Sequence, residues 1–242
     1  MTDFNGHSYR KRVKAEGMVS FRVAVKETDL WVSADRDLAE ETRDLILDSR
    51  HQLESYIRSK PEFLTTLQPY PEDDYAPPIV KEMIQVTRSA SVGPMASVAG
   101  AVAQFVGKGL LELTDQVIVE NGGDIFLKVD RRVTVSVFAG ESPLSGRIGL
   151  VVHERQMPLG VCSSSGSVGH SLSTGAADVI CLLSPSPVLA DGAATAVGNR
   201  VKKSKDLERA AEWADEIGGI MGGVAIMDDR MATWGDVELV GL

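Results

Sequence analysis

The spacing of apolar residues divides the chain into strands and helices. The segments FRVAV and LWVSA alternate around a polar turn at 26–29, which predicts a β-hairpin. Over residues 37–59 apolar residues recur at helical spacing, which predicts a helix with one buried face. A shorter helix is expected at 79–86. A further helix of small residues begins at Gly93-Pro94, because proline is tolerated in a first turn.

The second half of the chain predicts further strands and helices in a similar order. Strands are expected at 116–120, 124–129, 132–138, 147–152 and 159–162, with final strands after about residue 221. Asn121-Gly122-Gly123 suits a tight turn, and Asp130-Arg131 predicts a second hairpin turn. Helices are expected after the Pro-Ser-Pro segment and after Ser204. This order predicts an α+β fold with antiparallel sheets backed by helices and two related halves.

Length and composition indicate a folded soluble protein. We expect residues 1–242 to form a single domain, with halves at 1–90 plus the C-terminal strands and at 91–200. The net charge of −9 argues against a general nucleic-acid binder and against an anionic membrane surface. Two cysteines without a C-x-x-C pair, and an N-terminus without an apolar signal segment, predict a reducing cytoplasm.

The segment CLLSPSPVLADGAATAVGN carries the clearest candidate chemistry. Asp191 and Thr195 stand four residues apart and therefore share one helix face. A carboxylate and a hydroxyl among small residues are oxygen ligands suited to Mg²⁺, which keeps water or phosphate in its other positions. The alternative is that Asp191 is the N-cap of this helix and has no metal to hold.

A hydroxyl- and glycine-rich segment, SSSGSVGHSLSTG, lies upstream of that helix at 163–175. Its backbone N–H groups and hydroxyls are suited to cradle a phosphate, although it lacks the P-loop and dinucleotide fingerprints. The alternative is a flexible surface loop. His170 lies within this segment, and a neutral imidazole can serve as a base near pH 7.

The order of four motifs over residues 92–199 resembles the ApbE-like family, the FAD:protein FMN transferases. The motifs are a glycine-rich helix start, an N-G-G-D-I hairpin, a histidine-led loop ending in T-G, and the A-D-G-A-A-T-A helix. The resemblance implies a T-fold-like ββααββ architecture. Two features depart from the family: Ala99 stands where the family has lysine before glycine, and the Asp-Pro pair is missing from the short loop after His170.

The resemblance also implies a site and its ligands. The ligands are FAD or FMN together with Mg²⁺, and the partner is an acceptor protein. The expected site residues are His170 as catalytic base, Asp191 and Thr195 for the metal, and, for the flavin or nucleotide, Gly122, Gly123, Asp124, Ser163, Ser164, Ser165, Gly166 and Thr174. Association into a homo-oligomer stays open, because the sequence does not identify the oligomeric state.

The two departures predict that FMN transfer is weak or altered, since a missing positive charge and a displaced base both slow phosphoryl chemistry. Two other functions therefore stay open. One is a non-catalytic protein that binds a flavin, a nucleotide or another anionic small molecule. The other is an enzyme of unrelated chemistry on the same scaffold, because fold alone does not set function.

Overall fold

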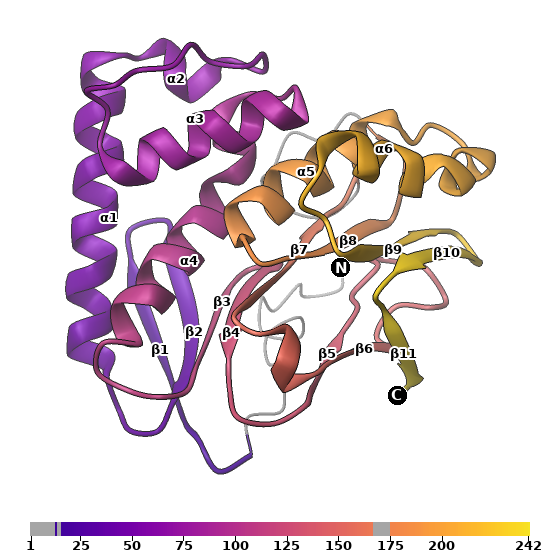
Figure 1. Cartoon of the computed structure of the whole chain (residues 1–242), viewed down its shortest axis with the longest axis horizontal. Helices are drawn as coiled ribbons and strands as arrows, with labels where there is room; N and C mark the ends of the chain where they lie inside the picture. The colour runs from indigo at the N-terminus through magenta and orange to yellow at the C-terminus, as the bar shows by residue number, and fades with distance from the viewer. Residues whose placement is uncertain (1–12, 14–15, 167–174) are drawn as a thin grey trace, which may run out of the picture.

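The computed structural model describes residues 13, 16–166 and 175–242 (Figure 1). Its main feature is an antiparallel sheet of eight strands in the order β1-β2-β3-β4-β7-β8-β9-β10. These strands are β1 (Val19–Val25), β2 (Thr28–Ala34), β3 (Val117–Asn121), β4 (Asp124–Lys128), β7 (Leu159–Ser164), β8 (Val179–Ser184), β9 (Gly222–Met227) and β10 (Arg230–Gly235).

A second, three-stranded antiparallel sheet has the order β11-β6-β5. It consists of β5 (Val133–Ser136), β6 (Ile148–Val152) and β11 (Glu238–Gly241). Strand β5 follows β4 in the chain but pairs with β6, and β4 pairs with β3 and β7. The predicted hairpin turn at Asp130-Arg131 is therefore wrong: the chain leaves the main sheet at this point.

The helices lie between the strand pairs. They are α1 (Ala39–Ser59), α2 (Glu62–Thr65), α3 (Pro78–Ala90), α4 (Val98–Leu110), α5 (Pro187–Arg200) and α6 (Ala210–Ile217), with 3-10 turns η1 (Pro94–Ser97), η2 (Glu154–Gln156) and η3 (Ser204–Arg209). In the described ranges no single helix has the length and apolar content to cross a membrane. The bent pair of α3 with η1 and α4 does meet that requirement as a pair, by length and composition alone.

The main sheet repeats one order of elements twice. Strands β1 and β2, a group of helices, and β3 and β4 make the first run. Strands β7 and β8, α5 and α6, and β9 and β10 make the second. The predicted α+β fold with two related halves is confirmed. The two runs meet where β4 pairs with β7.

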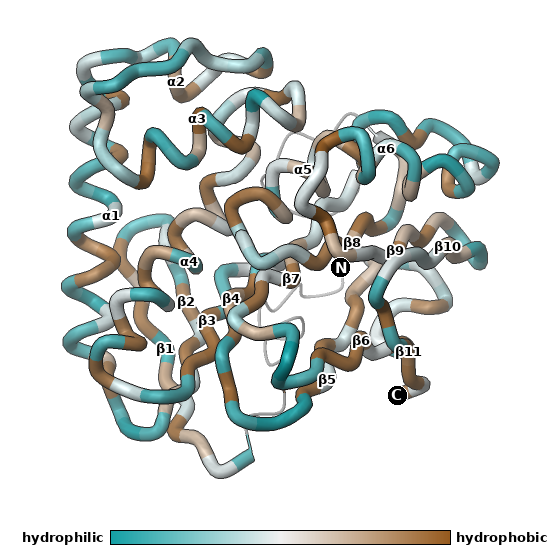
Figure 2. Tube along the Cα trace, viewed as in Figure 1, coloured by the Kyte–Doolittle hydropathy of each residue, from teal (hydrophilic) through white to brown (hydrophobic). Residues whose placement is uncertain are grey.

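The sheet is packed on both faces. On one face α1, α3 and α4 cover the first run, and α5 and α6 cover the second. On the other face β5 and β6 pack against β4, β7, β8 and β9. Figure 2 shows hydrophobic residues along the central strands and hydrophilic residues on the outer turns of α1. The start of α4 and the first turns of α5 meet where β4 pairs with β7.

Candidate functional site

The expected helix α5 begins at the last residue of the Pro-Ser-Pro segment and so has a proline in its first turn. Ser186 is its N-cap, and the Ser186 hydroxyl accepts a hydrogen bond from the Leu189 N–H at 3.3 Å. Pro187 follows at the first helical position, where no N–H is needed. Asp191 lies one turn further along, so the alternative in which Asp191 caps α5 is wrong.

Asp191 instead caps the neighbouring helix α4. Its Oδ2 accepts a hydrogen bond from the Gly100 N–H at 2.8 Å, and the Ala99 N–H also stabilises this carboxylate. Ser97, the residue before α4, donates its hydroxyl to the Pro94 carbonyl at 3.0 Å and makes no side-chain cap of its own. The Asp191 carboxylate therefore satisfies N–H groups that a helix start leaves without a partner in its own helix.

Glycine at position 100 permits this approach of α4 to α5. A Cβ on Gly100 would lie 2.4 Å from the Pro187 carbonyl oxygen and 2.8 Å from the Asp191 Cβ. Any larger side chain would push the two helices apart. Asn121 adds a third tie, because its Nδ2 donates to the Ala99 carbonyl at 3.0 Å and joins the end of β3 to the start of α4.

A second buried carboxylate, Asp124, lies beside Asp191. Asp124 is the first residue of β4, is 6% exposed, and accepts a hydrogen bond from the Ser163 N–H at 3.3 Å. Burial raises the pKa of Asp191 well above its ordinary value, and the negative charge of Asp124 raises it further. The N–H groups of Gly100 and Ala99 act in the opposite direction. The structure thus sets two acidic groups close together in a site that excludes most water.

Cys162 faces the same space from β7. The register between β4 and β7 pairs Ile125 with Val161, and the next pair along the two strands would be Asp124 and Cys162. The Cys162 thiol donates to the Pro187 carbonyl at 3.4 Å. Burial raises the thiol pKa, and the charges of Asp124 and Asp191 add to the shift. A thiol in this state is a poor nucleophile.

The other predicted residues that the structure describes lie in the turn between β3 and β4, on α5, and at the end of β7. Gly122 has φ +64°, in the left-handed region that the tight turn between β3 and β4 requires, and Gly123 completes the turn. Thr195 lies one helical turn beyond Asp191 and is 5% exposed. Ser164 ends β7. Ser165 and Gly166 follow, and the Gly166 N–H donates to the Ala177 carbonyl at 3.0 Å.

Two predicted residues, His170 and Thr174, lie outside the described residues. Three residues that sequence reasoning missed are Gly100, Asn121 and Cys162. Their roles depend on contacts between segments far apart in the chain. Asn121 carries the one local signal, since it is the first residue of the N-G-G-D turn, but this pattern indicates only a turn former.

The residues present fit a hard divalent cation. Among the described residues no group of three or more His, Cys, Asp and Glu side chains could hold a metal ion. The site at Asp191 offers two carboxylates and neighbouring hydroxyls instead, and Mg²⁺ is usually bound through one or two carboxylates plus water or substrate phosphate. A cation there would also offset the repulsion between Asp124 and Asp191.

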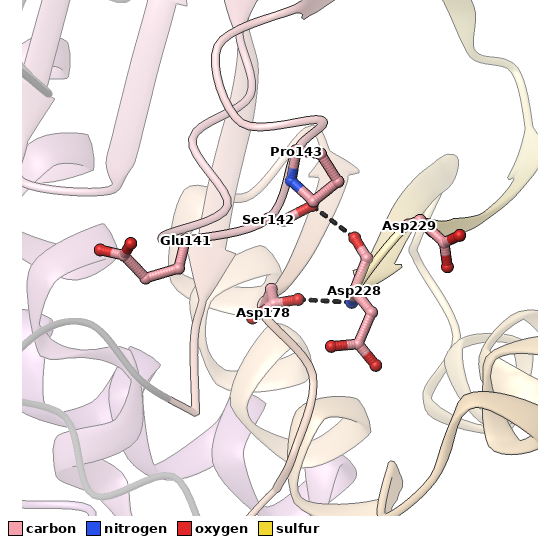
Figure 3. Close-up of a pocket in the computed structure, with 6 residues that line it drawn as sticks. All are labelled: Glu141, Ser142, Pro143, Asp178, Asp228 and Asp229. Atoms are coloured by element: carbon pink, nitrogen blue, oxygen red, sulfur yellow. Dashed lines mark hydrogen bonds between the residues drawn. The ribbon is translucent and has the colours of Figure 1, made fainter.

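An acidic pocket lies near the turn between β9 and β10. It is lined by Glu141, Ser142, Pro143, Asp178, Asp228 and Asp229 (Figure 3). The Ser142 hydroxyl donates to the Asp228 carbonyl at 2.6 Å, and Asp178 accepts from the Asp228 N–H at 2.6 Å. These polar groups thus hold the turn in place. None of the predicted site residues lines this pocket.

Comparison with known proteins identifies relatives along most of the chain. A family model described as "AbpE bacteria" matches residues 10–217. A UPF0280 protein of Methanothrix thermoacetophila is 42% identical over 209 residues, covering 85% of this chain and 87% of that protein. A UPF0280 protein of Methanocella arvoryzae is 40% identical over 212 residues, covering 87% and 86% of the two chains. The names of these relatives state no activity.

Solved structures share the fold at low sequence identity. A variant of the flavin transferase ApbE from Vibrio cholerae superposes with a TM-score of 0.60 at 12% identity, covering 90% of this chain and 97% of that one. The apo flavinyl transferase ApbE of Pseudomonas stutzeri gives 0.58 at 13% identity, covering 90% and 94%. The family model, the close relatives and this common architecture agree, and the chain belongs to the ApbE-like family.

Proposed function

We propose that this protein binds a flavin or nucleotide together with a divalent cation, and that its FAD:protein FMN transfer is weak. The observation that carries the proposal is the burial of the Asp191 carboxylate beside a second carboxylate, Asp124, at the start of α4. Two neighbouring buried acids are costly unless a cation or proton offsets their charge. The fold shared with flavin transferases supports the nature of the ligand.

Asp191 and Thr195 would hold the cation, and the glycine turn at 122–123 with Ser163 to Gly166 would contact the flavin or nucleotide. A cation at this place would neutralise pyrophosphate charge when FAD is cleaved. His170 would take the proton from the hydroxyl of an acceptor protein, the role that the family motif gives to it. Localisation in the cytoplasm is consistent with Cys162 and Cys181, which are both free thiols.

The expectation of weak FMN transfer rests on the residue at position 99, near the start of α4. Ala99 offers only a methyl group where the family has a lysine, while its N–H and carbonyl are engaged with Asp191 and Asn121. One source of charge stabilisation for the transferred group is thus missing at this position, and losing such a contact commonly costs about 10²- to 10³-fold in rate. The same observation favours the second candidate, a flavin- or nucleotide-binding protein without transferase activity.

Melting temperature with and without Mg²⁺ or Mn²⁺ tests the cation, because a ligand of the native state stabilises it by mass action. The parent should melt at a higher temperature with the metal. Asp191→Asn keeps an oxygen for the Gly100 N–H and should lose the metal-dependent shift. Asp178→Asn, in the acidic pocket, is the matched control and should retain it. An unchanged shift in Asp191→Asn would place the cation elsewhere.

Mass spectrometry tests the transferase activity. The protein is incubated with FAD, Mg²⁺ and an acceptor domain, and the addition of FMN to that domain is followed over time. We expect little or no addition, together with flavin binding detected by fluorescence. Stoichiometric transfer at a rate comparable to that of an intact family member would contradict the weak-transfer proposal.

A further inference from the structure

The buried hydroxyl of Ser164 has no hydrogen-bond partner among the described residues. The residue is 5% exposed, and its Oγ makes no hydrogen bond to any described residue. An unsatisfied buried hydroxyl costs stability, and folded proteins retain few of them. A ligand that supplies the missing contact would explain why this one is retained.

The direction of Ser164 follows from the pleat of β7. Gly160 lies against Pro187 of α5, and the Cys162 thiol donates to the carbonyl of that proline, so both face the helix layer. Side chains alternate along a strand, so Ser164 also faces this layer, about 6.7 Å beyond Cys162. Gly175 packs against Gly198, which lies near the end of α5.

Asp124 faces the same layer from the neighbouring strand. Phe126, two residues on in β4, packs against Gly107 of α4, so Asp124 also points toward the helices. The space bounded by Asp124, Asp191 and the end of β7 therefore receives two carboxylates and the hydroxyl of Ser164. Thr195 is buried one turn from Asp191 on α5, and its hydroxyl lies on the same face of the helix by that spacing.

We propose that Asp124 and Ser164 are ligands of the divalent cation in addition to Asp191 and Thr195, giving two carboxylate and two hydroxyl oxygens. The inference rests on the proposed function and extends its metal site. Two carboxylates match the charge of a divalent cation. The hydroxyls are neutral ligands that add no further charge, and the remaining positions of a six-coordinate ion are left for water or a phosphate of the bound nucleotide.

The test is titration calorimetry of the purified full-length protein with Mn²⁺ alone, together with melting temperatures in the absence of metal. Ser164→Ala should weaken Mn²⁺ binding on the order of tenfold, the scale seen when one supporting group of a metal site is removed. Without metal, the variant should melt at the parent's temperature or above it, because an unsatisfied hydroxyl has been removed. Asp124→Asn should weaken binding further.

Thr42→Val is the matched control. The Thr42 hydroxyl is also buried without a partner among the described residues, but it lies in the first turn of α1, away from the start of α4. This variant should keep the parent's affinity for Mn²⁺. A lower metal-free melting temperature for Ser164→Ala, with unchanged Mn²⁺ affinity, would show a structural hydroxyl and overturn the inference.

The remaining outcomes separate this inference from the proposed function. If Asp191→Asn loses Mn²⁺ binding while Ser164→Ala and Asp124→Asn keep it, the inference fails and the proposed function stands. If Ser164→Ala weakens only the binding of FMN and not of Mn²⁺, its hydroxyl contacts the nucleotide alone, as in the proposed function, and the wider set of metal ligands is wrong. If the parent binds no Mn²⁺, both the inference and the metal-dependent function fail.

Discussion

At the scale of single residues, the contact between α4 and α5 depends on Gly100, a glycine that does not belong to a turn. Gly100 lies inside a helix, where glycine ordinarily costs stability relative to alanine. Here the missing side chain lets the Asp191 carboxylate reach the backbone of α4 and lets Pro187 pack against it. The close approach of two helices therefore outweighs helix propensity at this position.

We predict that Gly100→Ala lowers the free energy of unfolding by about 1–3 kcal/mol, the usual cost of forcing an extra methyl group into a packed interior. The new Cβ would meet the Pro187 carbonyl at 2.4 Å, and backbone cannot rotate away as a side chain can. Urea denaturation measures the change. Gly241→Ala, with nothing within 4 Å of the added Cβ, is the control. Equal stability of both variants would contradict a tight contact.

At the scale of elements, much of the strand and helix order could be predicted from local spacing. The prediction of a turn at 121–124 is confirmed, because its glycines are a signal carried within four residues. The turn at 130–131 was wrong because alternation identifies a strand but not the sheet that it joins. The capping of α4 by Asp191 could not be predicted, since the two bonded residues are 91 positions apart.

Asp35 joins the end of β2 to the segment that leads into β3. Its carboxylate accepts hydrogen bonds from the Thr114 hydroxyl at 2.6 Å and from the Gln116 amide side chain at 3.0 Å. The hydrogen bond from Thr114 is the main cause of the lowered pKa of Asp35, and the contacts from Gln116 add to it. The carboxylate form is thus favoured in the folded state.

A lowered folded-state pKa means that the stabilisation is present above the unfolded pKa, about 3.9, and is lost as the pH falls through the folded value. We predict that Asp35→Asn is less stable than the parent near neutral pH, and that the difference shrinks below about pH 4. Urea denaturation at several pH values measures it, with the exposed Asp44→Asn on α1 as control. A constant difference across this range would contradict the assigned role.

At the scale of the whole molecule, the two runs are joined by the pairing of β4 with β7, and both contribute residues to the candidate site. Asp124 and Gly100 belong to the first run, and Ser163 and Asp191 belong to the second. The apolar cluster under β5 and β6 includes Ile118 and Ile125 of the first run together with Val179 and Val224 of the second. A shared core of this kind favours cooperative unfolding.

We therefore predict a single unfolding transition, as the expected single domain requires. Trp31 lies in the first run, while Trp213 and Trp234 lie in the second. Fluorescence of a Trp31→Phe variant reports only the second run, whereas far-ultraviolet circular dichroism reports both. The two curves should coincide in urea. Separate midpoints would show that the runs unfold independently.

The hydrogen bond between Asp191 and Gly100 also has a consequence for the order in which the chain folds. Closing a loop of 91 residues costs more entropy than forming a hairpin, so this contact forms after the local ones. During synthesis the first strands and α4 leave the ribosome well before residue 191 does. Until then the first turn of α4 lacks its capping carboxylate. A nascent chain can therefore form much of the first run while the contact between α4 and α5 is still absent.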